Sequence, residues 1–586
     1  MFIVGLNYWS KKGGPLMWRE FDRQVIQKEL QQISSLGVNV VRAFTFWPDF
    51  QDSPGTVNEG SMEELRDFLD IAQAAGVKVY LTFIVGHMSG ENWDPAWKDR
   101  SFFELEHETD FYISTLVKRF KNHPAVGGWI LSNELPIYAT DKKEVVTKWI
   151  RNTVTLIKSI DRSHPVSTGD GYWGIIAPSS FDPFEYADLV DYHGPHTYTP
   201  DSDAYRQTVF PQFVLKASKI NDKPVILEEF GASSVLGSDE HIAGYYRALL
   251  SGSLAAGASG AWGWCYSDFD LKNQRPYSHH PHELEYGVTT VDWKVKPQGL
   301  ELQKFSQFLR DFGDAAPIED DVGLLIPSYV HEQYPFTSQH EAYAISSSLL
   351  SAFCMLLQNR INPRVMHEQT LSKQVIDESQ ASYSWPRLLI LPYAIRYTAK
   401  TQEALRNFVE EGGSVMLSYG FNSWFNFRSL GIEHDLFYNH AARLESVSVE
   451  VDGGSVRLSA AEAFHDQWNY DASIAPVKGG DVLLYSGGLP ILVKNQLGKG
   501  RVYFITFPFE RWVAASPWPF ESSDPHLIYK RVLGLEGFKD RHEGWSKWIQ
   551  AVRFSNGKEL VINHSWEKTA AGGMELIPKG YAAINP

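Results

Sequence analysis

Two glutamates stand at the ends of apolar, strand-like segments. Glu134 follows the apolar run of GGWILSNELP (residues 127–136), and Glu229 ends that of PVILEEFG (residues 224–231). Facing carboxyl groups are what cleavage of a glycosidic bond needs, because one donates a proton to the leaving oxygen while the other attacks the anomeric carbon. A separation of about 5 to 5.5 Å implies a covalent intermediate and retention, whereas about 6.5 to 9.5 Å implies inversion.

The elements that must position these glutamates form a regular pattern in the first half of the chain. Short β-branched runs alternate with amphipathic helical stretches, several of which end at a glycine. The predicted strands are residues 1–9, 38–47, 77–86, 126–134, 164–171, 187–198, 224–231 and 257–268. Eight such units predict a (β/α)8 TIM barrel, in which polar residues at strand ends converge on one mouth.

Other polar and aromatic residues occupy corresponding places. Arg42 lies within the second strand, His196 and Tyr198 end the sixth, and Trp264 ends the eighth. Glu228 directly precedes Glu229, so in a regular strand it points to the opposite side and is expected to be a supporting acid.

The aromatic content, 14% of the residues, gives a further indication. Large chains need aromatic core residues, but several tryptophans lie near predicted strand ends, where flat apolar faces suit a sugar: Trp9, Trp47, Trp93, Trp97, Trp262 and Trp264. His87 ends the third strand and either touches substrate or caps a loop.

The stretch SHHPHE (residues 278–283) places three histidines beside Glu283. It lacks the two separated ligand pairs of a structural zinc site, so it is expected to line a sugar cleft and not to bind metal. We expect no metal and no cofactor.

These motifs resemble a known family. WILSNELP resembles the strand-four Asn-Glu-Pro signature of clan A glycoside hydrolases, particularly family five, although Leu135 stands between the glutamate and the proline. PVILEEFG resembles the strand-seven motif of the same family. The resemblance covers roughly residues 1–310 and implies Glu134 as general acid/base, Glu229 as nucleophile, and net retention of configuration.

The resemblance also implies roles for the supporting residues. Arg42 matches the arginine that keeps the nucleophile anionic, and Asn133 the asparagine that binds the sugar 2-hydroxyl. Tyr198 matches the tyrosine that donates to the nucleophile, and His196 the histidine near the acid/base, with His193 as the alternative.

The eighth strand offers two candidates for the floor beneath the reacting sugar. Period-2 alternation places Trp262 and Trp264 on the same face, and Trp264 is preferred.

Composition excludes other classes of protein. The formal net charge of −16 leaves no broad basic face for nucleic acid. The two cysteines lie in apolar runs, no apolar run is long enough for a membrane span, and no signal peptide is recognisable. We therefore expect no membrane partner and a cytoplasmic protein.

The second half of the chain changes character. Residues 1–315 are predicted to be the catalytic barrel, 316–540 an α/β domain of flavodoxin or amidotransferase type with a β-rich insertion, and 541–586 a small β-domain. This arrangement resembles the tail of family forty-two β-galactosidases, which implies a homo-oligomer, with a trimer as one form.

The expected function is a retaining β-glycoside hydrolase of exo type or acting on short oligosaccharides, with β-mannosides (β-mannosidase or β-mannanase activity) preferred. A β-galactosidase or β-glucosidase on the same scaffold is the alternative. A non-catalytic carbohydrate-binding protein is a further hypothesis, and nucleotide binding by the middle domain is disfavoured because no glycine-rich phosphate loop is present.

Overall fold

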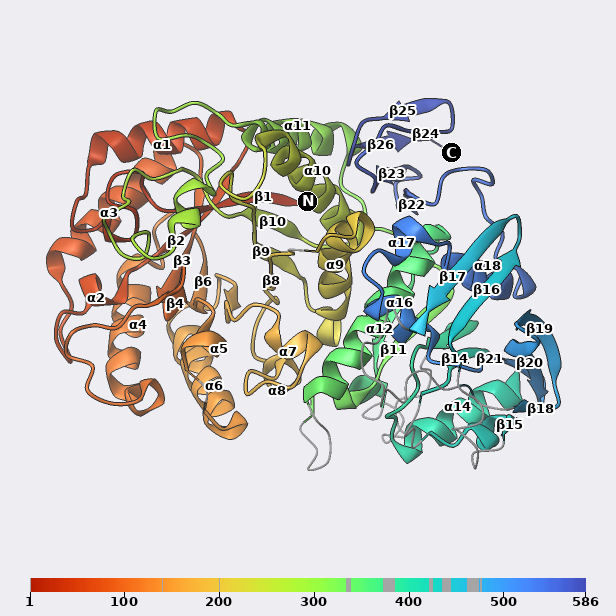
Figure 1. Ribbon diagram of the computed structural model, residues 1–586. Helices are drawn as coiled ribbons and strands as arrows, with labels where there is room; N and C mark the ends of the chain where they lie inside the picture. Colours follow the sequence, from red (N-terminus) through yellow and green to blue (C-terminus); the bar gives the residue numbers. More distant parts are fainter. Residues whose placement is uncertain are drawn as a thin grey trace. The chain divides into compact units, whose positions relative to one another are not determined.

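The computed structural model describes residues 2–139, 141–199, 201–332, 339–371, 385–420, 425–434, 444–460, 474 and 477–585. These residues form two compact units (Figure 1). The first comprises residues 1–175, 179–198 and 218–316, and the second comprises residues 176–178, 199–217 and 317–586. Among the described residues, none of the helices is long and apolar enough to cross a bilayer.

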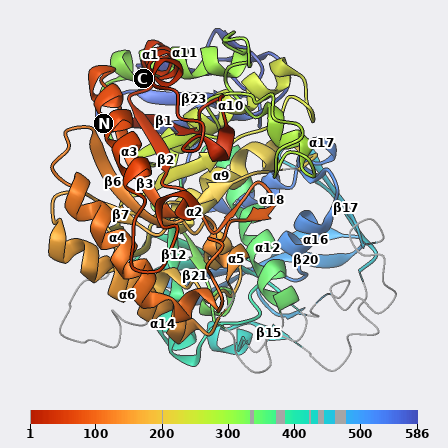
Figure 2. The ribbon, with the colours of Figure 1, turned by 90° about the vertical axis from the view of Figure 1, so that its left-hand side faces the viewer.

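The first unit contains the predicted barrel, and each strand falls within its predicted run. Its strands are β1 (Ile3–Tyr8), β2 (Val40–Phe44), β3 (Lys78–Ile84), β6 (Val126–Ser132), β7 (Val166–Ser167), β8 (His196–Thr197), β9 (Ile226–Phe230) and β10 (Gly260–Gly263). All pair in parallel in the order β7-β6-β3-β2-β1-β10-β9-β8. Figure 2 shows β6, β3, β2 and β1 side by side. The first strand pairs with the last, which confirms the barrel.

The two shortest strands, β7 and β8, form the edges of this order. The segment that precedes β8 is linked to β7, because the amide of Asp191 donates to the carbonyl of Val166 at 2.9 Å. Short strands leave long loops at the barrel mouth, and these loops carry several residues described below.

The helices of the first unit follow the expected pattern. They include α1 (Arg23–Ser35), α3 (Glu59–Ala74), α4 (Glu106–Phe120), α6 (Lys143–Ile160), α10 (Asp239–Ala255) and α11 (Pro297–Phe312). Asp22 and Asn58 cap α1 and α3 by accepting hydrogen bonds from first-turn amides. The barrel interior is filled by a cluster drawn from several strands: Val40, Tyr80, Ile130, Tyr192, Ile226 and Trp262.

The second unit is an α/β structure with added β elements. Its main sheet has the order β12-β11-β13-β14-β21-β20-β19, with β12 (Arg364–His367), β11 (Val322–Ile326), β13 (Leu388–Leu391), β14 (Ser414–Ser418), β21 (Gly500–Ile505), β20 (Leu489–Leu497) and β19 (Asp481–Ser486). The first five strands are parallel and the last two pair antiparallel.

Helices and smaller sheets complete this unit. The longer helices are α9 (Ala204–Ala217), α12 (Gln339–Gln358), α14 (Ala399–Glu411), α16 (Phe509–Ala515) and α18 (His526–Leu535). A hairpin is formed by β16 (Ser446–Val451) and β17 (Gly454–Ser459). A C-terminal sheet is formed by β22 (Ile549–Arg553), β23 (Glu559–Asn563) and β26 (Tyr581–Ile584). The predicted fold class, a barrel followed by an α/β domain and a small β-domain, is confirmed.

Candidate active site

Glu134 stands immediately beyond β6, in a backbone conformation that is unusual for a residue with a side chain. Its φ is 46° and its ψ 40°, in the left-handed region. Its amide donates to the carbonyl of Gly169 at 2.9 Å, and Leu135 and Pro136 then begin the short helix α5 (Leu135–Tyr138). This turn ends the buried strand on a carboxylate, and non-glycine residues in such conformations cluster at functional sites.

Glu229 lies in β9 and is held by two donors. Arg42 Nη1 lies 2.5 Å from Glu229 Oε1, and the Tyr198 hydroxyl donates to Oε2 at 2.8 Å. The Arg42 side chain is fully buried, and Thr82 accepts a hydrogen bond from its Nε at 3.0 Å. A guanidinium and a phenol directed at one carboxylate stabilise its anionic form.

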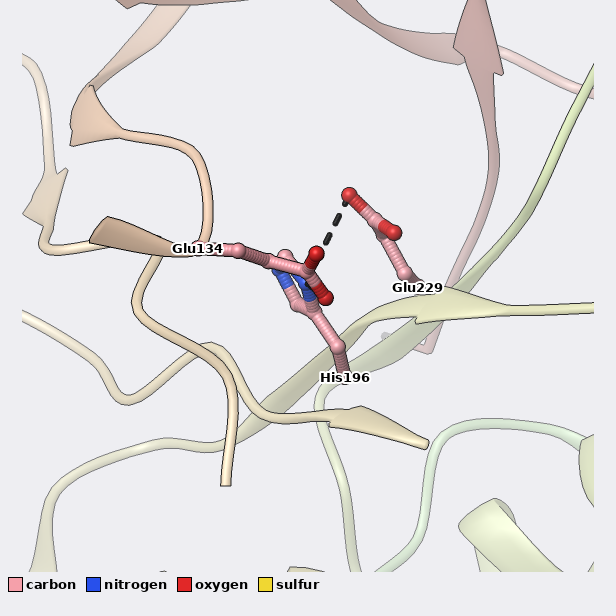
Figure 3. A group of neighbouring side chains, drawn as sticks. All are labelled: Glu134, His196 and Glu229. Carbon is pink, nitrogen blue, oxygen red and sulfur yellow. Dashed lines mark hydrogen bonds and ion pairs between the residues drawn. The ribbon is translucent and has the colours of Figure 1, made fainter. Parts of the chain in front are cut away.

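The two carboxyl groups face each other with His196 beside them (Figure 3). One carboxylate oxygen of Glu134, one of Glu229 and one ring nitrogen of His196 all lie within 4.8 Å of one another. Nearest oxygens this close favour the shorter carboxyl separation that is typical of retaining glycosidases.

The consecutive glutamates of β9 do not alternate as a regular strand would. The pairing of β9 with β10 runs from Leu227 with Ala261 to Phe230 with Gly263, so β9 holds one extra residue there. Such a bulge interrupts side-chain alternation. Glu228 and Glu229 consequently both approach His196, at 3.6 and 3.5 Å, and the expected opposite direction of Glu228 does not occur.

Glu228 is fully buried, and the surrounding chain makes room for it. Ser167 Oγ donates to Glu228 Oε1 at 2.6 Å, while Oε2 lies 3.6 Å from His196 Nε2. A Cβ at Gly194 would lie 2.2 Å from the Glu228 carboxyl carbon. Only glycine therefore fits at position 194 with Glu228 in this place.

His196 lies close to the carboxyl groups of Glu134, Glu228 and Glu229. Its Nδ1 lies 3.3 Å from Glu134 Oε1, and its other nitrogen faces Glu228. Burial lowers the pKa of His196, but the three surrounding carboxylates outweigh burial and raise it to about 9. His196 is therefore an imidazolium at neutral pH.

The two facing carboxyl groups titrate together because each charge acts on the other. Burial raises the pKa of Glu134, but the hydrogen bond and charge of His196 bring it below its usual value. Burial and the charge of Glu134 raise the pKa of Glu229, against His196, Arg42 and Tyr198. Since Arg42 and Tyr198 both donate to Glu229, the proton of the site is held on the opposite side, between Glu134 and His196.

Two further predicted residues lie at this mouth. Asn133 donates through Nδ2 to the carbonyl of His87 at 2.7 Å, and its buried Oδ1 has no partner in the described part of the chain. His87 contacts Asn92 Oδ1 at 2.7 Å, and its charge helps to lower the pKa of Glu134.

Trp264 follows β10 and is 6% exposed. The Trp264 side chain acts to lower the pKa of the Glu283 carboxyl, and the Trp264 amide donates to the carbonyl of Phe230 at 2.7 Å. Trp264 is thus held between the end of β9 and the loop that carries Glu283.

Three of the predicted site residues lie elsewhere. Trp262 belongs to the barrel interior, with its ring 4.9 Å from Tyr80. Trp47 is fully buried against Trp97 and Phe102. His193 pairs with Val225 at the start of β9, below the catalytic level that His196 shares with Glu229.

The loops after β3 and β10 are tied together. Ser89 Oγ donates to Glu283 at 2.9 Å, and Glu91 lies 2.9 Å from His279 and 3.0 Å from Arg275. Burial raises the pKa of Glu283 to about 7, and Glu229 and Glu134 act in the same direction. The histidine-rich stretch thus builds one side of the mouth.

In the described part of the chain, Glu134, His196 and Glu229 are the group close enough to hold a metal ion. The Arg42 guanidinium already occupies one oxygen of Glu229 and repels a cation. These residues suit acid, base and nucleophilic chemistry better than metal binding.

The chain is similar to known glycoside hydrolases. Residues 10–270 match the family model described as cellulase (glycosyl hydrolase family 5). Mannan endo-1,4-beta-mannosidase 7 of Arabidopsis thaliana is 27% identical over 36% of this chain and 60% of its own length. Mannan endo-1,4-beta-mannosidase F of Aspergillus clavatus is 22% identical over 50% of this chain and 73% of its own. The chain thus spans about three-fifths of the Arabidopsis relative.

Solved structures resemble the chain over nearly its whole length. An exo-beta-1,4-mannosidase from Opitutaceae bacterium strain TAV5 has a TM-score of 0.73 at 21% identity, covering 92% of this chain and 95% of that one. A cold-adapted beta-galactosidase from Rahnella sp. R3 has a TM-score of 0.70 at 14% identity, covering 99% and 98%. At these identities the likeness is one of fold. The similarity to glycosyl hydrolase family 5 is carried by residues 10–270 of this chain.

Proposed function

We propose that this protein is a retaining β-glycoside hydrolase that releases sugar from β-mannosides by double displacement. The observation that carries the proposal is the approach of Glu134 and Glu229 within 4.8 Å, with Arg42 and Tyr198 both donating to Glu229. A carboxylate kept anionic opposite an acid with access to a proton is the arrangement that the two-step mechanism requires.

In the first step, Glu229 attacks the anomeric carbon and the bond to the leaving oxygen breaks. Glu134 protonates that oxygen with the proton that it shares with His196 Nδ1, 3.3 Å away, and is left as a carboxylate beside a neutral imidazole. Tyr198 and Arg42 then lie beside a neutral ester, and they favour the second step because it regenerates the Glu229 carboxylate that they stabilise. There Glu134 removes a proton from water, and the water oxygen displaces Glu229.

The preference for mannosides rests on the named relatives, among which are plant and fungal mannan endo-1,4-beta-mannosidases and a bacterial exo-beta-1,4-mannosidase of similar fold. The bridge between the loops after β3 and β10 favours exo action or short oligosaccharides, because it obstructs one side of the mouth. The full-length likeness to beta-galactosidases keeps β-galactosides as the second candidate.

The test is the hydrolysis of aryl β-mannoside, β-glucoside and β-galactoside, with proton NMR of the first sugar released. We expect the mannoside to be fastest, the β-anomer to appear first, and Glu134→Ala and Glu229→Gln to lose the activity. A faster galactoside would replace the substrate assignment, and an α-anomer as first product would overturn the mechanism.

We also propose that the protein forms a homo-oligomer and that it lies in the cytoplasm. The α/β character of the second unit and its resemblance to an oligomerisation domain support a homo-oligomer, with a trimer as the form to test by light scattering. Cys265 and Cys354 are both buried and unpaired, which supports a reducing, cytoplasmic location.

A further inference from the structure

The loop that follows β7 carries two stacked aromatic side chains with no part in the mechanism above. The rings of Tyr172 and Trp173 lie 5.1 Å apart at an interplanar angle of 23°. Trp173 is 36% exposed, although tryptophan is among the most hydrophobic side chains. Exposed apolar side chains that gather near a reaction centre can mark a ligand-binding surface.

This loop is fixed next to the catalytic acid. Gly169 accepts the hydrogen bond from the Glu134 amide at 2.9 Å. Gly171, with a φ of 79°, lies between the Trp173 indole and His196. A Cβ at this position would be 3.7 Å from the indole and 3.9 Å from Cβ of His196. His196 in turn contacts Glu134 at 3.3 Å.

Buried hydrogen bonds hold the loop in this place. Asp170, 7% exposed, accepts from Thr168 Oγ1 at 2.7 Å and from the Tyr186 hydroxyl at 2.5 Å. The aromatic pair therefore stands on an anchored loop, which limits the entropy lost when a ligand packs against it.

The chemistry fixes which part of a substrate lies there. The acid must reach the leaving oxygen, so the departing group lies on the Glu134 side of the reacting sugar. Ile137, 42% exposed, also belongs to this side, since its amide donates to the Glu134 carbonyl at 2.9 Å. Two exposed apolar side chains thus flank the acid.

We propose that Trp173, backed by Tyr172, is the binding surface for the leaving-group sugar. The ligand class is a hexopyranose linked to the reacting sugar through the scissile oxygen, whose apolar C–H face packs on the indole. This inference rests on the proposed function and adds to it a preference for saccharide over small leaving groups.

The test compares two substrates with the same reacting sugar, β-1,4-mannobiose and β-mannosyl fluoride. The fluoride has no ring to place on Trp173. Trp173→Ala is expected to lower kcat/KM for mannobiose about 10-fold, in the range of aromatic stacking contacts, and to leave the fluoride within about twofold. Trp173→Phe, which keeps a ring, is expected to retain most of the mannobiose activity, and thermal denaturation checks that both variants fold.

The outcomes separate the two proposals. Equal losses on both substrates, or no loss on mannobiose, would overturn the role of Trp173 while leaving the hydrolase intact. If the wild-type protein cleaves neither substrate, the mannosidase proposal fails first, and the same comparison is made with the disaccharide and fluoride of the sugar that is cleaved.

Discussion

Replacing Glu228 with glutamine should shift the alkaline decline of kcat/KM to lower pH. The buried carboxylate lies 3.6 Å from His196 Nε2, and unit charges at that distance interact by about 4.6 kcal/mol at an effective dielectric constant of about 20. This corresponds to about three pKa units. The pKa of His196 should therefore fall from about 9 to about 6.

The consequence for catalysis follows from the proton held between His196 and Glu134. When the His196–Glu134 pair loses its shared proton, Glu134 has none to donate to the leaving oxygen, so kcat/KM declines. The wild-type protein should keep kcat/KM up to about pH 9, whereas Glu228→Gln should begin to lose it near pH 6, a deficit of about 100-fold at pH 8.

The assay is kcat/KM for an aryl β-glycoside between pH 4 and pH 10, with Ser167→Ala as the matched control. That variant removes the neutral hydrogen bond to Glu228 Oε1 and keeps the charge, so its limb should stay within about one unit of wild type. An unchanged alkaline limb in a folded Glu228→Gln protein would refute the reasoning, because the charge would then have no influence on His196.

Three further predictions concern the site and the second unit. In Glu134→Ala, azide should restore cleavage of a substrate with a good leaving group and yield the β-glycosyl azide, since the ester on Glu229 still forms; an α-azide would contradict the assignment. Gly194→Ala should lower both activity and stability, by roughly 1–3 kcal/mol or more in urea unfolding, because its Cβ meets the Glu228 carboxyl; an unaffected protein would show that β9 can shift. Burial lowers the pKa values of three histidines of the second unit, His367, His526 and His564, to about 3, so the unfolded chain takes up protons that the folded chain does not. Stability should then fall as pH drops below about 6.5, by up to about 4 kcal/mol per pH unit for the three together, and His564→Gln should reduce this slope by about a third; equal slopes would be the contrary result.

Strand ends could be predicted from the sequence because local pattern determines them. The runs that end at Glu134 and Glu229 are apolar, β-branched and bounded by turn residues, and each formed the strand expected of it. In a barrel the carboxyl ends of the strands share one mouth, so the proximity of Glu134 and Glu229 followed from topology without knowledge of any contact.

What could not be predicted depends on register and packing between strands. The bulge that turns both Glu228 and Glu229 toward His196 arises from the pairing of β9 with β10, which no local pattern reports. Alternation placed Trp262 and Trp264 on one face, but Trp262 fills the barrel interior while Trp264 lies above the end of the strand.

The long loops were the least predictable part. Residues 169–171 belong to the end of the fifth predicted strand, and the sequence indicated no role for the aromatic residues that follow. Only the position of Gly171 between Trp173 and His196 shows that this aromatic pair lies near the acid. Trp47 looked similar in sequence and is instead core, because its neighbours Trp97 and Phe102 pack around it.

The central claim is that Glu229, and not the adjacent Glu228, forms the covalent bond to sugar. The most direct measurement is trapping with a 2-deoxy-2-fluoro-β-mannosyl fluoride, followed by peptide mass spectrometry. We predict that a single sugar is attached at Glu229, whose carboxylate is the one that Arg42 and Tyr198 hold in place. A label on Glu228 or Glu134, or inactivation by this reagent without any covalent label, would contradict the account.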